Sequence, residues 1–311
     1  MQYNKLKSLN KKVSKIGLGC VTFGREIDKE QSLNILDFAY ESGINLLNTS
    51  YYYGEGNSEI ILGNYFATRK NRSDFTVVTK IHGNLSSKVI ENCINKSLKR
   101  MKTDYIDFYG ITYDPNNKLE EILETMEKFK KQGKILQVAC NNFDYNLLES
   151  SKKIQKNNLY SNFGILETVY NILYRGAEKE ILNHCNKENI DIITYSPLGA
   201  GFITGKYKNN LEFPKNTRFD IKPGHKDIYF KKNFFEKINK MKLLSEKTNL
   251  ALIDLALAWI ISKDFISSIL IGVRQKHHLE KPIYLLKNKL NNEILKEIEI
   301  ITKNNFDLIA P

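Results

Sequence analysis

Residues that could carry out proton transfer follow several apolar runs in the first third of the chain. Three consecutive tyrosines at 51–53 come shortly after Asn48, which ends one such run, and Lys80 ends another. Thr112 follows a third. A tyrosine hydroxyl can give or take a proton, and a neighbouring lysine cation lowers its pKa. Residues of these types at the ends of apolar runs are therefore candidates for a site built on the ends of strands.

The segments around these residues alternate between strand and helix patterns. Short apolar and β-branched runs predict eight strands, at 16–19, 46–48, 75–80, 105–109, 135–139, 163–167, 190–195 and 267–271. Amphipathic or capped segments predict helices at 28–43, 59–66, 86–101, 119–132, 144–154, 178–189, 234–247, 252–262 and from 277. A long irregular segment, 196–233, separates the seventh strand from its helices.

This alternation predicts one α/β domain over residues 1–311, a single (β/α)8 TIM barrel with an N-terminal segment at 1–14 and a C-terminal helix and tail at 287–311. A doubly wound sheet is the alternative, but it needs a glycine-rich dinucleotide loop after its first strand. Gly17 and Gly19 lie inside that strand and lack a third glycine and an acidic partner.

In such a barrel the active site lies at the C-terminal ends of the strands. Reading those ends yields Cys20, Asn48 to Tyr53, Lys80, Thr112, Asn141, Asn142, Glu167, Tyr195, Ser196 and Gly272 to Arg274. His82, two residues past Lys80, is a candidate for substrate contact, as is Phe23 in the loop after the first strand.

The stretch 47–63, LNTSYYYGEGNSEIILG, resembles the aldo-keto reductases, whose pattern here is D-T-A-x-x-Y-G-x-G-x-S-E-x-x-L-G. The matching residues are Thr49, Tyr53, Gly54, Gly56, Ser58, Glu59, Leu62 and Gly63. The resemblance implies that Tyr53 protonates a carbonyl oxygen while a nicotinamide gives hydride, and that Lys80 lowers the pKa of this tyrosine. Asn48 stands where the family has an aspartate that pairs with the lysine. Thr112 stands where it has a histidine that orients the carbonyl.

Later segments resemble the cofactor-binding part of the same family. Residues 195–201, YSPLGAG, and 204–207, TGKY, look like the segments in which an aromatic ring stacks on nicotinamide and a loop cradles pyrophosphate. Arg274 lies in a segment similar to the one that holds the adenosine 2′-phosphate, which favours NADP(H) over NAD(H). The residues expected at the cofactor are Cys20, Asn141, Asn142, Glu167, Tyr195, Ser196, Leu198, Gly201, Lys206, Arg218, Gly272, Arg274 and His278.

Three departures from the family pattern bear on activity. Asn48 cannot neutralise Lys80, so we expect an unpaired lysine cation that pushes the pKa of Tyr53 further down. Thr112 is a weaker donor than imidazole, at a cost of about 2 to 4 kcal/mol in orienting the carbonyl. Glu167 replaces a glutamine that faces the nicotinamide carboxamide, and a carboxylate can accept a hydrogen bond there but not donate one.

These departures leave three classes of function open. The first is an NADP(H)-dependent oxidoreductase of a carbonyl or alcohol, for instance a sugar or other polyol, with weak activity on generic aldehydes and a preference for taking a proton from an alcohol. The second is a cofactor-binding redox sensor or interaction protein, as the potassium-channel β subunits of this superfamily are. The third is a lyase or epimerase that returns its hydride. His82 could supply the missing imidazole.

Composition limits the class of protein further. The net charge of +12 suits an anionic cofactor, but no dense basic block with interleaved aromatics indicates a nucleic-acid partner. No apolar run reaches the roughly 18 to 20 residues that span a bilayer, and no signal-peptide core opens the chain. The four cysteines are widely spread. We expect a cytoplasmic protein with a small-molecule substrate, no membrane contact and no metal; its oligomeric state stays open.

Overall fold

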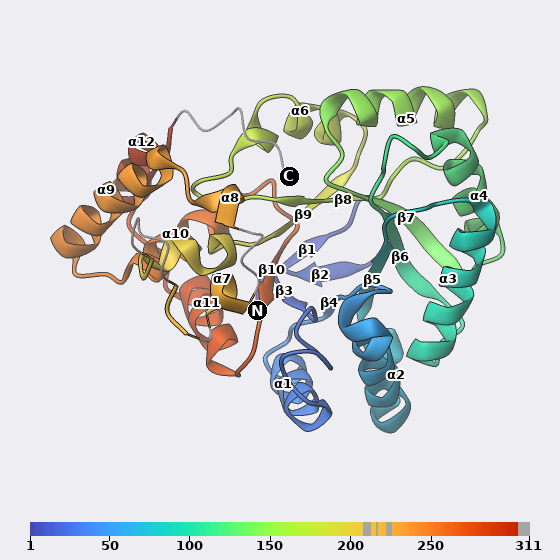
Figure 1. Ribbon diagram of the computed structural model, residues 1–311, viewed down its shortest axis with the longest axis horizontal. Helices are drawn as coiled ribbons and strands as arrows, with labels where there is room; N and C mark the ends of the chain where they lie inside the picture. Colours follow the sequence, from blue (N-terminus) through green and yellow to red (C-terminus); the bar gives the residue numbers. More distant parts are fainter. Residues whose placement is uncertain (208–212, 216, 222–225, 304–311) are drawn as a thin grey trace.

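Eight parallel strands close into a barrel in the computed structural model, which describes residues 1–207, 213–215, 217–221 and 226–303. Around the barrel the order is β10, β3, β4, β5, β6, β7, β8 and β9 (Figure 1). The strands are β3 (Ile16–Gly19), β4 (Leu46–Asn48), β5 (Thr76–Ile81), β6 (Ile106–Ile111), β7 (Ile135–Asn141), β8 (Ile165–Val169), β9 (Asp191–Tyr195) and β10 (Ser268–Gly272). The closed parallel barrel confirms the predicted (β/α)8 fold.

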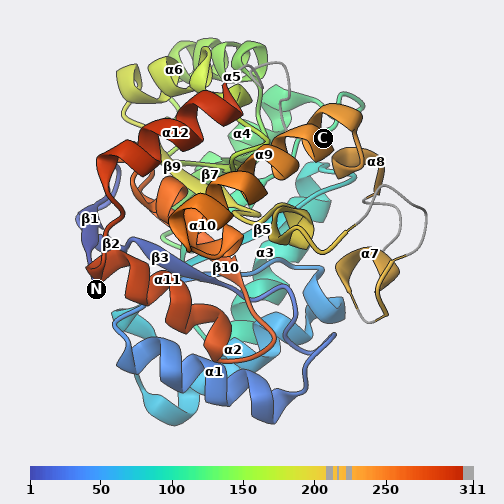
Figure 2. The ribbon, with the colours of Figure 1, turned by 90° about the vertical axis from the view of Figure 1, so that its left-hand side faces the viewer.

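Helices follow the strands as predicted. The flanking helices are α1 (Lys29–Glu41), α2 (Asn57–Arg69), α3 (Ser87–Met101), α4 (Leu119–Lys131), α5 (Tyr145–Asn157), α6 (Ile181–Lys187), α10 (Leu252–Ile261) and α11 (His277–Lys287). α9 (Lys232–Thr248) and α12 (Asn292–Thr302) pack with α10 on one side of the barrel, which faces the viewer in Figure 2. α1 begins after Asp28, whose side chain accepts a hydrogen bond from the backbone N–H of Gln31 and so caps the helix.

The strands separate two apolar cores. One fills the space between the strands and the outer helices, and the other lies inside the barrel. The inner cluster consists of Leu6, Val13, Leu46, Val78, Phe108, Ala139, Ile165, Ile193 and Leu270. Leu6 and Val13 come from an antiparallel hairpin of β1 (Tyr3–Lys5) and β2 (Lys12–Ser14), which closes the N-terminal end of the barrel. The expected N-terminal segment 1–14 thus holds two strands that we did not predict, because three-residue strands carry too little pattern.

The long segment after β9 contains more helix than expected. It forms the short helices η4 (Gly199–Thr204), α7 (Arg218–Ile221) and α8 (Lys226–Tyr229). The ring of Phe219 lies 4.8 Å from that of Tyr207 and 5.1 Å from that of Phe230, between centroids, so aromatic packing holds these helices together. Residues 208–212, 216 and 222–225 of the predicted irregular segment and residues 304–311 of the predicted tail lie outside the described residues.

Candidate active site

The three consecutive tyrosines lie in different surroundings. The guanidinium carbon of Arg100 lies 4.4 Å from the ring centroid of Tyr51, and Tyr52 is 42% exposed. Tyr53 opens the short helix η1 (Tyr53–Gly56), and its ring centroid lies 5.5 Å from the Nζ of Lys80. Of the three, Tyr53 therefore occupies the place beside the lysine that the motif spacing predicts.

Hydroxyl groups fasten the start of α2 to the strand ends below it. Thr49 and Ser58 share a hydrogen bond of 2.8 Å, and the Oγ of Ser58 also donates to the carbonyl of Cys20 at 2.9 Å. Gly54 and Gly56, which lie between Thr49 and Ser58 in the chain, have φ of 56° and 94°, left-handed values that glycine adopts without strain. Together these features hold the turn that carries Tyr53 in one conformation.

An ion pair between the half-buried Arg100 and the buried Glu59 supports the same turn from the side. The carboxylate of Glu59 accepts hydrogen bonds from the Oγ1 of Thr79 at 2.8 Å and from the Nη1 of Arg100 at 3.1 Å. The same Nη1 donates to the backbone carbonyl of Tyr51 at 2.9 Å. Arg100 thus positions the chain just before Tyr53. This role of Arg100 could not be predicted from the sequence, because a basic residue in the last turn of a helix is common for electrostatic reasons alone.

Lys80 lies near the C-terminal end of β5 and is only 9% exposed. Its Nζ donates to the Oδ1 of Asn48 on β4 and to the Oε1 of Glu167 on β8, each at 2.7 Å. Burial is the largest single effect and by itself lowers the pKa of Lys80, but the charge and hydrogen bond of Glu167 together with the charges of Tyr53 and Tyr195 outweigh it, so that the pKa of Lys80 is raised. The expectation of an unpaired Lys80 is therefore wrong. The carboxylate that pairs with Lys80 belongs to Glu167 on β8, which is 119 residues from Asn48 in the sequence.

Asn141, at the end of β7, brings an oxygen without a partner into the barrel. Its Oδ1 is buried and has no hydrogen-bond partner among the described residues. A Cβ added at Gly110 would lie 2.5 Å from this oxygen and 3.1 Å from the Cβ of Lys80, so glycine there makes room for both side chains. The next residue, Asn142, has φ of 55°, and its Oδ1 accepts a hydrogen bond from the hydroxyl of Tyr195 at 3.1 Å. A buried acceptor near an aromatic ring suits a carboxamide, which carries two N–H donors.

Cations gather on the rim beyond β9 and β10. Burial and the cation of Arg274 lower the pKa of Lys206, and burial, Arg25 and Arg274 lower that of Arg218. Arg25 and Arg218 both contact the carboxylate of Glu26, at 2.7 Å and 3.3 Å. The lowered pKa values of Lys206 and Arg218 mark a region of positive potential, which favours an anion such as a phosphate group.

The loop between β9 and these cations turns sharply. Its left-handed residues are Ser196, Gly199, Ala200 and Gly201, with φ of 55°, 56°, 55° and 89°. The carbonyl of Leu198 accepts the backbone N–H of Gly201 at 2.9 Å and so closes the turn. Beyond β10, which ends at the exposed Gly272, the Nδ1 of His278 accepts the backbone N–H of Arg274 at 3.1 Å. The predicted cofactor segments thus lie on neighbouring strands of the barrel.

A model of the aldo/keto reductase family matches residues 15–303, which include all of these residues. The chain belongs to the aldo/keto reductase family. The aldo-keto reductase YhdN of Bacillus subtilis (strain 168) is 26% identical to it over 329 aligned positions, which cover 100% of this chain and 97% of that protein. The family consists of oxidoreductases that act on carbonyl substrates.

Four further candidates lie in less expected surroundings within this reductase. Cys20 and Phe23 are fully buried and expose no surface to a cofactor or substrate, so the structure does not support the contacts predicted for them. Thr112 is half-buried just after β6, and its backbone N–H donates to the carbonyl of Ile81 at 3.0 Å. His82 is exposed, with its ring centroid 4.4 Å from that of Tyr52.

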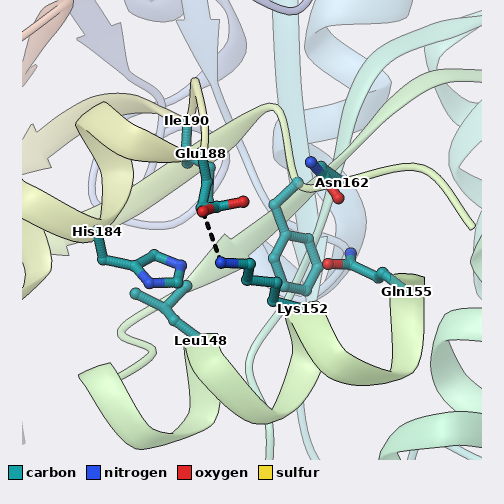
Figure 3. A pocket seen from close by; sticks show the side chains of 8 residues that line it. Leu148, Lys152, Gln155, Asn162, His184, Glu188 and Ile190 are labelled. Atoms are coloured by element: carbon teal, nitrogen blue, oxygen red, sulfur yellow. Dashed lines mark ion pairs between the residues drawn. The ribbon is translucent and has the colours of Figure 1, made fainter. Parts of the chain in front are cut away.

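A small pocket of about 10 Å³ lies between α5 and α6 of the reductase (Figure 3). Its walls include Asn162 and Ile190, which precede β8 and β9, so it lies toward the N-terminal ends of the strands, away from the candidate site. An ion pair of 2.7 Å joins Lys152 to Glu188 there (Figure 3). With room for about one water molecule, it is not a substrate site.

The described residues hold neither a cluster of metal-ligating side chains nor a helix that could span a membrane. No group of three or more His, Cys, Asp and Glu side chains there is arranged to hold a metal ion. No helix there combines the length and the apolar character needed to cross a bilayer.

Proposed function

We propose that this reductase is an NADP(H)-dependent oxidoreductase in which Tyr53 exchanges a proton with a carbonyl or alcohol substrate. The observation that carries the proposal is the approach of the Lys80 Nζ to the ring of Tyr53, 5.5 Å from its centroid. The raised pKa of Lys80 keeps its amine charged, and a nearby cation stabilises the tyrosinate form. The hydroxyl of Tyr53 can therefore release its proton to a carbonyl oxygen more readily.

The residues present fit a phosphorylated nicotinamide cofactor, which supplies or accepts hydride when it is bound. Asn141 would accept from the carboxamide through its unpartnered Oδ1, and Tyr195 would lie against the ring. Lys206, Arg218 and Arg274 would neutralise phosphate charge at the rim. We propose NADP(H) over NAD(H) because a guanidinium such as that of Arg274 matches a phosphate in shape and charge.

We propose that activity on simple aldehydes is weak because of Thr112. A threonine hydroxyl is shorter than imidazole and a weaker donor, and a lost donor to a developing oxyanion costs about 2 to 4 kcal/mol. Thr112→His is therefore expected to raise kcat/KM on simple aldehydes by about tenfold or more. The paired state of Lys80 removes the reason for expecting a bias toward alcohol oxidation, so Tyr53 serves either direction.

The test is a titration of the purified protein with NADPH and NADH, followed by a panel of carbonyls and alcohols. Tight NADPH binding with turnover would support the proposal, provided that Tyr53→Phe still binds NADPH but loses turnover. Binding without turnover on any compound would favour a redox sensor or a redox-neutral lyase or epimerase. No binding of either nucleotide would overturn the proposal.

A further inference from the structure

Two departures from the family pattern touch each other inside the barrel. By the motif resemblance described above, Asn48 stands where the family has an aspartate and Glu167, 119 residues further along the chain, stands where it has a glutamine. β4 and β8, which carry them, occupy opposite positions in the ring of eight strands. The Nδ2 of Asn48 donates to the Oε2 of Glu167 at 2.7 Å. Substitutions in direct contact can compensate for each other, as scattered substitutions cannot.

We infer that Glu167 has taken over the place of the missing aspartate as the counterion of Lys80. The Oε1 of Glu167 accepts from the Nζ of Lys80 at 2.7 Å, and the two side chains are only 4% and 11% exposed. Water has little access to such a pair, so the ammonium depends on this carboxylate for its charge balance. The inference rests on the function proposed above, in which Lys80 supports Tyr53.

The exchange keeps both the charge and the hydrogen bonds of the site. With aspartate at 48 and glutamine at 167, the aspartate would accept from Lys80 and the glutamine amide could donate to the aspartate. Here the amide belongs to Asn48, which accepts from Lys80 through Oδ1 and donates to Glu167 through Nδ2. In both arrangements one ammonium, one carboxylate and one amide meet. Only the strand that carries the negative charge differs.

Glu167 is thus a positioning residue that acts through Lys80. The ionisable groups whose charges act on Lys80 come from several elements: Glu167 on β8, Tyr53 on η1 and Tyr195 on β9. Cys20, after β3, also lies within range of its charge. Asn48, Lys80 and Glu167 form a triangle of hydrogen bonds that engages both oxygens of Glu167. The nicotinamide carboxamide would therefore be bound by Asn141.

The experiment is a cycle of four proteins: the parent, Glu167→Gln, Asn48→Asp and the double variant. Glu167→Gln should lower Tm and reduce kcat at pH 7 by about tenfold or more, because the buried Lys80 ammonium loses its carboxylate and each unit by which the pKa of Lys80 falls changes its protonated fraction by up to tenfold. On the alkaline side of its pH–rate profile, activity should therefore be lost at a lower pH than in the parent. Asn48→Asp places two carboxylates in contact and should also lower Tm. The double variant should recover most of the Tm, the kcat and the parent pH profile.

Glu59 supplies a matched control, because its carboxylate is also buried and is paired with Arg100 outside the triangle. Glu59→Gln should lower Tm, and adding Asn48→Asp to it should bring no recovery. If a carboxylate at position 48 compensated for the loss of any buried carboxylate, Asn48→Asp would restore Tm in both the Glu167→Gln and the Glu59→Gln background. If it replaces Glu167 as the counterion of Lys80, it restores Tm only in the Glu167→Gln background.

The unfolding measurements need no turnover, so they separate this inference from the proposed function. If the parent turns over no substrate, the proposed function fails, while recovery of Tm in the double variant still supports the counterion role. A double variant no more stable than Glu167→Gln, or one that does not fold, would overturn the inference. So would a parent-like pH profile in Glu167→Gln. If Glu167→Gln itself does not fold, a folded double variant supports the exchange.

Discussion

A buried lysine lies at either end of the barrel, and the two have opposite electrostatics. Lys80, near the C-terminal end, is paired with Glu167 at 2.7 Å and its pKa is raised. Lys15, just before β3 at the N-terminal end, donates to two backbone carbonyls at 2.7 Å and 2.8 Å. Burial lowers the pKa of Lys15 to about 8, against a weaker opposing effect of Asp264. Burial lowers the pKa of both lysines, and only at Lys80 do the hydrogen-bonded carboxylate of Glu167 and the nearby Tyr53 and Tyr195 together outweigh it.

The two lysines also contribute to stability with opposite dependence on pH. The folded-state pKa of Lys15 lies below its unfolded value of 10.5, so the unfolded state binds more protons between about pH 8 and 10.5. Through Lys15, stability therefore rises with pH in that range. The pKa of Lys80 lies above its unfolded value. Its contribution is complete below the unfolded pKa and is lost as pH rises through the folded one.

The largest expected effect separates the two lysines by activity. Lys80→Met should reduce turnover by about 10²- to 10⁴-fold, the range for loss of effective acid–base catalysis, because Tyr53 loses its neighbouring cation. Lys15→Met, at the other end of the barrel, should change kcat by less than about twofold. Steady-state rates of the two variants with NADPH and one carbonyl check this. Similar losses of turnover in the two variants would contradict a specific role of Lys80 in catalysis.

The next effect separates them by stability. Between pH 7 and 9.5, deprotonation of Lys15 should raise the free energy of unfolding by about 2 kcal/mol. Lys15→Met should lack this component of the rise, while Lys80→Met should retain it. Urea unfolding of the parent and both variants across this pH range measures the difference. A parallel pH dependence in the parent and in Lys15→Met would contradict the lowered pKa of Lys15.

The rim beyond β9 and β10 extends the comparison to a group of neighbouring cations, Lys206, Arg218 and Arg274. Arg274→Ala should weaken NADPH binding by about tenfold, since a charge-assisted hydrogen bond contributes about 1.5 to 3 kcal/mol before solvent screening. NADH binding should hardly change. Lys276→Ala, an exposed residue two positions along, is the matched control. Fluorescence titrations with both nucleotides decide the matter, and equal losses for NADPH and NADH would argue against a 2′-phosphate contact at Arg274.

The smallest effect concerns His82, the histidine two residues past Lys80. Because His82 is exposed and its ring lies against Tyr52, His82→Ala should change kcat by less than about twofold. Kinetics on the best substrate found above provide the measurement. A large loss in kcat with unchanged NADPH binding would instead make His82 the replacement for the missing imidazole.

Local pattern accounted for most of the framework. β3 and β4 have the predicted bounds, and α1 begins after Asp28 as expected. The spacing of the motif placed Tyr53, rather than Tyr51 or Tyr52, beside Lys80. These features depend on periodicity, capping and turn chemistry within a few residues, which a single sequence displays directly.

By itself the sequence determined the barrel, the strand ends and the presence of a tyrosine and a lysine at one of them. Only the tertiary structure decided which carboxylate balances Lys80, which arginine holds the turn before Tyr53, and that Phe23 is buried. Glu167 lies 87 residues from Lys80, and their contact exists because eight strands close into a ring with a fixed register. Side chains alternate between the two faces of a strand, so a slip of one residue would turn that carboxylate out of the barrel.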